Sequence, residues 1–162
     1  MTQMAISKAT ATKLSTDGEA RLRRLADWDL SKVTRRTQRR MGWSSARRRV
    51  VEREYRRFLG LVIIDPSTSY GMAGEVDEVW HDHILDTEDY FSFCRQVIGA
   101  IVHHVPSDGL PSDGTDNAYE KQTLPALRQA YRGPLSAVWP TQSDAKAVAR
   151  CCGHISEFPV VW

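Results

Sequence analysis

The amino-acid sequence predicts an all-α protein, a compact single-domain bundle of about five to six helices joined by irregular loops. Apolar residues recur three and four positions apart along most of the chain, which is the spacing of one helical face. Alternation of apolar and polar residues, typical of half-buried strands, is weak throughout. With 162 residues and 41% hydrophobic content, the chain can bury one core. We therefore expect a single domain over 16–162, after a disordered stretch at 1–15.

The first two helices are expected in the most basic part of the chain. Thr16 and Glu19 have the spacing of a capping box, so a first helix should run over 17–33. Ser44-Ser45 offers an N-cap for a second helix, along which apolar residues recur at helical spacing. That helix should end just before Asp65-Pro66, because the residue before a proline avoids helical backbone.

Two further helices are expected in the middle of the chain, after a loop at 66–74 that is rich in Ser, Thr and Gly. One should cover 75–85. The other should begin near Thr87, which can act as its N-cap and is followed by two acidic residues that suit the helix dipole. We expect this helix to reach Val102.

The last third of the chain begins with a loop or lid over Pro106–Gly114, where Pro and Gly alternate with polar residues. One or two short helices should follow over 117–132, ended by Gly133-Pro134. A last helix is expected over 144–152, before Gly153.

The net charge of +2 hides a strong asymmetry. Residues 21–57 hold fourteen Lys or Arg against four Asp or Glu, whereas residues 58–162 hold six against fourteen. We therefore divide the domain into a basic helical arm at 16–57, a core at 58–106, and a loop with C-terminal helices at 107–162.

Composition also excludes several classes of protein. No run of eighteen apolar residues exists in the sequence, so a membrane-spanning helix is excluded. Three cysteines, two of them adjacent as Cys151-Cys152, do not make the disulfide framework of a secreted domain, and the cytoplasm is the expected location. The P-loop, the Rossmann fingerprint, the Gly-x-Ser-x-Gly elbow and His-Glu-x-x-His are all missing.

Most side chains that could bind a metal or take part in catalysis lie between residues 76 and 104, which include four of the five histidines. On a helical wheel His83 falls on the stripe of Val76, Val79, Trp80 and Ile84, so it should point into the core. Asp77 and His81 are four residues apart on the flank of that stripe and can reach a shared ligand. On the next helix, Cys94 lies near the centre of the stripe formed by Tyr90, Val97, Ile98 and Ile101.

The position of the second histidine pair depends on where that helix ends. His104 continues the stripe of Cys94 if the helix persists, and His103 then turns away. Ten residues of straight helix span roughly 15 Å, too far for Cys94 and His104 to share one ion. In an antiparallel hairpin Cys94 falls close to the Asp77–His81 turn. The histidine pair then lies nearer the start of the preceding helix, unless Pro106 ends the helix early and folds the pair back.

These donors predict a transition-metal site for zinc, iron or copper. The candidate ligands are Asp77, His81, His83, Cys94, His103 and His104. Two or three protein ligands with room for water would indicate catalysis, and four would indicate a structural ion. The alternative for each residue is structural: His83 would bond a carbonyl, Cys94 would serve as a small hydrophobe, and Asp77 with His81 would support another ligand.

The stretch Val76-Asp-Glu-Val-Trp-His-Asp-His-Ile-Leu-Asp-Thr-Glu-Asp-Tyr-Phe-Ser-Phe-Cys94, followed by His103-His104-Val-Pro106, resembles the glycine-rich domain-containing protein family of plants and bacteria. The similarity covers roughly residues 50–106. It implies a helical module with its polar signature gathered at one site, and no particular reaction. The chain lacks the glycine-rich tail of the long plant members.

Two hypotheses of function follow. The first is a small metalloprotein, an oxidoreductase or hydrolase that acts on a small molecule through the His/Asp/Cys cluster of 77–104. The second is a non-enzymatic module whose basic residues 21–57 bind an acidic protein partner or nucleic acid. In a third interpretation of the arm, its arginines form a solvated face that docks on the acidic body or on another subunit of a homo-oligomer.

Overall fold

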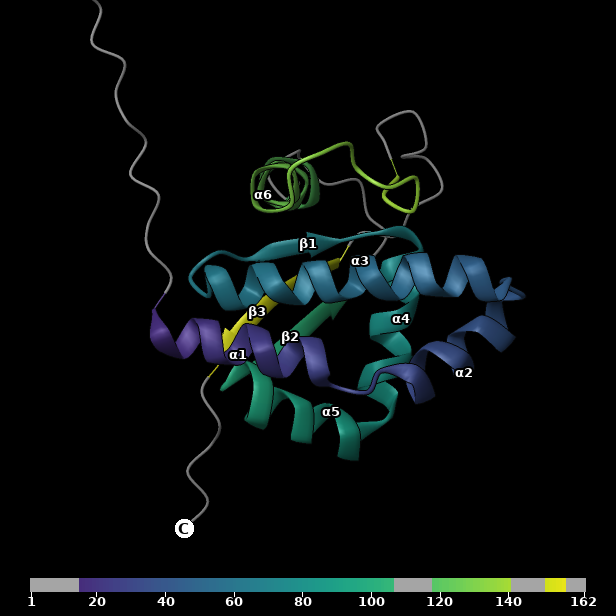
Figure 1. The fold of residues 1–162 in the computed structure, drawn as a ribbon, viewed down its shortest axis with the longest axis horizontal. Helices are drawn as coiled ribbons and strands as arrows, with labels where there is room; N and C mark the ends of the chain where they lie inside the picture. Colours follow the sequence, from purple (N-terminus) through teal and green to yellow (C-terminus); the bar gives the residue numbers. More distant parts are fainter. Residues whose placement is uncertain (1–14, 107–117, 141–150, 157–162) are drawn as a thin grey trace, which may run out of the picture.

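The computed structural model describes residues 15–106, 118–140 and 151–156 (Figure 1). Within these ranges the chain forms six α-helices, two short π-helices and one sheet of three short strands. The mainly helical fold is as predicted, but the sheet is not. No helix in the described ranges is long and apolar enough to cross a bilayer.

The basic arm folds as α1 (Thr16–Asp27), α2 (Ser31–Met41) and the first half of α3 (Ser45–Ile64). The single helix predicted over 17–33 is wrong, because the backbone becomes extended at Trp28. The carboxylate of Asp29 then accepts a bond of 2.9 Å from the amide of Ser31, the first residue of α2, and Leu30 is the N-cap of that helix.

The helix boundaries around α1 and α3 follow capping side chains. Ser15, rather than Thr16, is the N-cap of α1, and its hydroxyl accepts a bond of 3.0 Å from the Gly18 amide. The prediction for α3 is confirmed at both ends: the Ser44 hydroxyl accepts from the Arg47 amide at 3.1 Å, and the helix ends before Asp65.

In the middle of the chain, α4 (Gly74–Leu85) is confirmed, and α5 (Thr87–Phe93) begins where predicted. The expected loop over 66–74 contains a strand, β1 (Tyr70–Met72). The expected helix up to Val102 is wrong. After α5 and the π-helix η1 (Cys94–Ile98), Gly99 adopts a left-handed φ of 79°, and β2 (Ile101–Pro106) follows. Glycine takes this conformation without steric cost, so it ends the helix.

The C-terminal third supplies η2 (Tyr119–Thr123), α6 (Leu124–Ala130) and β3 (Cys151–Ser156). The expectation of one or two short helices over 117–132 is therefore confirmed. The helix predicted over 144–152 is wrong in its last two residues, which belong to β3, and the rest of it lies outside the described residues. Of the lid expected over Pro106–Gly114, the structure describes only Pro106, which ends β2. Of the disorder expected over 1–15, it describes only Ser15, where the expectation is wrong because Ser15 caps α1.

The three strands pair in the order β1-β3-β2, and both pairings are antiparallel. His104 lies opposite Gly153, which also faces Tyr70 on the other side. The sheet thus joins three segments that are far apart in the sequence. The alternation of apolar and polar residues could not reveal these strands, because each has only three to six residues.

The core forms where α3 crosses α4, and it contains the fully buried aromatic rings of Tyr55, Phe58 and Trp80. Phe58 packs on Trp80 with ring centroids 5.4 Å apart. This contact holds α4, which carries most of the candidate site, against the longest helix of the protein.

Three arginines of the basic arm, Arg36, Arg40 and Arg47, bind acidic side chains of α4. Arg40 donates to Glu78 at 2.8 Å and to Asp82 at 3.0 Å, and Arg47 donates through Nε to Glu75 at 3.0 Å. Asp82 is almost completely buried, so its charge needs such a partner. Of the interpretations open for the arm, the structure therefore shows docking on the acidic body of the same chain.

Candidate metal centre

Helix α4 presents its residues as the helical wheel predicts. Of the predicted stripe, Val76, Val79, Trp80 and His83 have no exposed surface, and Ile84 is partly buried against the core. Asp77 and His81 lie on its flank, one turn apart, and the Nε2 of His81 is 3.6 Å from a carboxylate oxygen of Asp77. Asp77 also lies in the first turn of α4, where the helix dipole favours a negative charge.

Strand β2 brings the third member of the site. The turn at Gly99 reverses the chain, and β2 then places His104 against α4. The side chains of Val102 and His104 share a face of the strand, because they are two residues apart. The ring of His104 packs on that of Trp80 with centroids 4.7 Å apart, and its side chain is only 9% exposed.

Asp77, His81 and His104 converge on one point. The two Nε2 atoms are 2.8 Å apart, and the Nε2 of His104 is 3.2 Å from Oδ1 of Asp77. One donor atom from each residue lies within 4.8 Å of the other two. A tetrahedral zinc with bonds of about 2.0–2.1 Å holds its ligand nitrogens about 3.3 Å apart. A shift of roughly half an ångström in the His81 ring, which is 41% exposed, would therefore admit an ion.

His83 points away from this group and is enclosed by the core. Its Nε2 donates to Asp89 at 3.0 Å, so its Nδ1 accepts the 2.9 Å bond from the Tyr55 hydroxyl. Burial lowers the pKa of His83 to about 4, against the opposing effect of the Asp89 carboxylate. His83 is therefore neutral at pH 7 and ties α4 to α3 and α5.

Cys94 and His103 are also outside the group. Cys94 is fully buried beside Tyr90 and the backbone of Val102, and burial raises the pKa of its thiol. His103 has a hydrogen bond of 2.6 Å to the Ser156 hydroxyl on β3. The structure thus brings together three of the six predicted ligands, within the residues that it describes, and the thiol of Cys94 is not one of them.

The buried, protonated thiol gives a prediction for Cys94. We expect its alkylation by iodoacetamide at pH 8 to be at least about 100-fold slower in the folded protein than in urea, because the reagent needs both access and thiolate. Mass spectrometry of the peptide that contains Cys94 measures this rate separately from those of the other cysteines. Equal labelling in the two states would contradict the burial of this thiol.

Sequence reasoning missed the residues that hold β2 in place. The indole Nε1 of Trp80 donates to the Tyr90 hydroxyl at 3.0 Å, and that hydroxyl donates in turn to the carbonyl of Val102. A signal was present, because Tyr90 lies on the buried stripe and a buried hydroxyl needs a hydrogen-bond partner. This chain of bonds fixes β2 two residues before His104.

Comparison with known proteins adds one finding. The chain matches no curated protein and no solved structure. The family described as UCP032817-like matches residues 20–132, a range that includes Asp77, His81 and His104. The description states no activity, substrate or cofactor. Because the match covers more than two thirds of the sequence, the chain belongs to the UCP032817-like family.

Proposed function

We propose that the protein is a metal-dependent enzyme in which Asp77, His81 and His104 hold one divalent transition-metal ion. The single observation that carries this proposal is the convergence of one carboxylate and two imidazoles from α4 and β2. The other sequence-predicted ligands, His83, Cys94 and His103, have separate environments and are left out of the ligand set.

The number and kind of donors favour catalysis over a structural role. Structural zinc sites are closed by four protein ligands, whereas catalytic sites have three and leave a position for water or substrate. Within the part of the chain that the structure describes, three donors meet, and the side chain of His81 is 41% exposed, so a small molecule could reach the ion from that side. Asp77 and His104, both under 10% exposed, would anchor the ion from within.

The identity of the metal decides between the two reaction classes. Zinc would supply a bound water of lowered pKa for hydrolysis, and ferrous iron with two histidines and one carboxylate would supply oxidation chemistry. In either case the part played by the chain is to fix Asp77 and His81 on one helix and to hold His104 on a strand that Trp80 and Tyr90 keep in register.

The wider setting of the proposal comes from the sequence. We propose a cytoplasmic location, which the cysteine pattern of the sequence favours. We also propose a relation to the glycine-rich domain-containing family, on the basis of the resemblance described above. We do not propose nucleic-acid binding by the arm, because arginines such as Arg40 and Arg47 already bind acids of α4.

Metal analysis of protein purified without a His tag tests the ligand set. We expect about one ion per chain in the wild type after exposure to Zn²⁺ or Fe²⁺, and less than about a fifth of that in His81→Ala and His104→Ala. His103→Ala is the matched control, since it removes an imidazole next to His104 that points elsewhere. A wild type that takes up no metal, or a His104→Ala variant that keeps it, would refute the proposal.

A further inference from the structure

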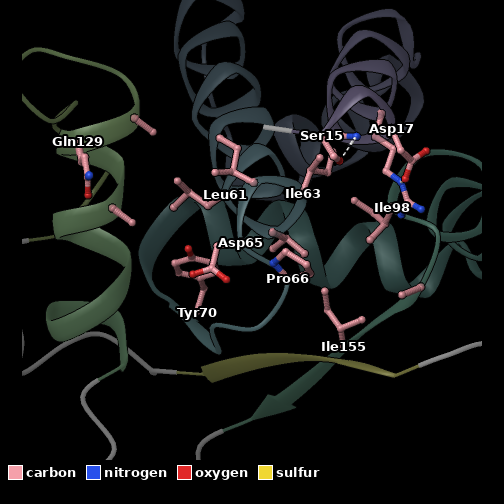
Figure 2. A pocket seen from close by; sticks show the side chains of 17 residues that line it. Ser15, Asp17, Leu61, Ile63, Asp65, Pro66, Tyr70, Ile98, Gln129 and Ile155 are labelled. Carbon is pink, nitrogen blue, oxygen red and sulfur yellow. Dashed lines mark hydrogen bonds and ion pairs between the residues drawn. The ribbon is translucent and has the colours of Figure 1, made fainter. Parts of the chain in front are cut away.

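Away from the candidate metal centre, a cavity of about 940 Å³ lies between α1, the end of α3, α6 and the sheet (Figure 2). The volume is within the range of small-molecule sites. Nine of its seventeen lining residues are Ala, Val, Leu or Ile, and Asp77, His81 and His104 are not among the seventeen. Most of a ligand in this cavity would therefore contact aliphatic side chains.

Three charged side chains line the cavity, and they do not balance. Arg21 donates to Asp17 at 2.7 Å, so these two form a neutral pair on α1. The carboxylate of Asp65 accepts instead from uncharged hydroxyls, those of Ser67 at 2.5 Å and Thr68 at 2.7 Å. These bonds lower the pKa of Asp65, which is therefore ionised at pH 7. No Lys or Arg of the described ranges forms an ion pair with it, so the lining has one surplus negative charge.

The end of α3 adds to this negative potential. Aligned peptide dipoles leave a partial negative charge at the C-terminus of a helix, where a basic side chain is favourable. The last turn of α3 has no basic residue, and Asp65 is the C-cap of the helix. The negative end of a 20-residue helix and a carboxylate thus meet at one wall of the cavity, and both favour a cation.

An aromatic ring lies at the same wall. Tyr70 lines the cavity and is 5% exposed, and its burial and the nearby charge of Asp65 raise the pKa of its hydroxyl. Figure 2 shows the two side chains beside each other at the cavity. A ring and a carboxylate in this arrangement suit an ammonium group, because the ring face and the negative charge both attract a cation.

We propose that this cavity binds an amphiphilic amine, a small molecule with an aliphatic body and one ammonium group. The aliphatic walls would hold the hydrocarbon body, and Asp65 and Tyr70 would hold the ammonium group at the end of α3. This assignment does not depend on the proposed metal centre, whose ligands lie elsewhere.

Isothermal titration calorimetry of the full chain at pH 7 tests this assignment with three ligands of one chain length. The ligands are octylammonium, octanol and octanoate, which differ in charge. We expect octylammonium to bind at least about tenfold more tightly than octanol, because only the ammonium group gains the carboxylate and the ring. Octanoate should bind more weakly than octanol, because its charge is repelled by Asp65.

Three variants locate the binding. In Asp65→Asn the affinity for octylammonium should fall at least about tenfold, and octanol should bind as it does to the wild type, which also shows that the variant is folded. The matched control is Glu19→Gln, which removes a carboxylate at an exposed position of α1 outside the lining and should retain the preference. Ala126→Phe fills the cavity from α6 and should weaken the binding of octylammonium and octanol alike.

The proposal is overturned if the wild type binds none of the three ligands, or if octanol or octanoate binds as tightly as octylammonium. It is also overturned if Asp65→Asn retains the preference for the ammonium, or if Ala126→Phe retains full binding.

Discussion

Saturating Zn²⁺ is expected to raise the melting temperature of the metal-free protein by about 10 °C. Free ion at a thousandfold excess over Kd contributes about 4 kcal/mol to the free energy of unfolding, and 1 kcal/mol shifts the melting temperature of a domain of this size by about 2–4 °C. The effect is large because one ion would link α4 to β2 through His81 and His104, which are 23 positions apart in the sequence.

The control for this measurement separates the site from metal that binds elsewhere. His104→Ala should show almost none of the increase, whereas His103→Ala should show nearly all of it, since His103 bonds to Ser156 instead. A chelator added to the zinc-loaded wild type should return the melting temperature to its starting value. An equal increase in His104→Ala would show that the added zinc does not act through this site.

The helical half of the candidate site could be predicted from the sequence, because it depends on a local periodicity. A spacing of 100° per residue is enough to place Asp77 and His81 together and to bury His83. The same rule placed Cys94 inside correctly, but burial alone does not make a ligand. The thiol lies beside Tyr90 and Val102 and is not among the donors that meet at Asp77, His81 and His104.

The position of His104 beside Asp77 and His81 could not be predicted from helical periodicity, because Gly99 ends the helix five residues before His104. The apolar stripe continues without a break from Cys94 through Ile101, and the wheel therefore favours helix. Gly99 in the left-handed conformation ends it, and the β-branched residues Ile101 and Val102 then pair with β3. Pairing with a strand about fifty residues later is a tertiary effect that no local pattern contains.

The arm was recognised from its charge, but the sequence could not decide which of its proposed contacts the arm makes. Fourteen basic residues in one stretch suggested an external polyanion, but Arg40 and Arg47 bind the acidic face of α4. Glu75 and Asp82 lie on the side of α4 that contacts the arm. Asp77 and His81 lie on the side that contacts His104 of β2. The arm thus holds the helix that carries two of the three candidate ligands.

Acid is expected to destabilise the protein through His83, by roughly 3 kcal/mol between pH 7 and pH 4. Burial lowers the pKa of His83 from 6.5 to about 4 in the folded state. Between these two values the unfolded chain binds the proton more readily than the folded chain, so the free energy of unfolding falls as the pH falls. Above pH 6.5 the imidazole is neutral in both states and adds no pH dependence.

Urea unfolding of the wild type and of His83→Gln, both in chelator, isolates this effect. The glutamine amide can donate to Asp89 and accept from Tyr55, as the neutral imidazole does, but it has no proton to gain. Every other titratable group is the same in both proteins, so the difference between the two pH profiles reports His83. We expect the wild type to lose roughly 3 kcal/mol more than the variant, and the NMR shift of the His83 ring to stay constant from pH 7 to about pH 5. Parallel profiles, or a ring that titrates near pH 6.5, would mean that His83 is open to water and does not join α3, α4 and α5 as a neutral group.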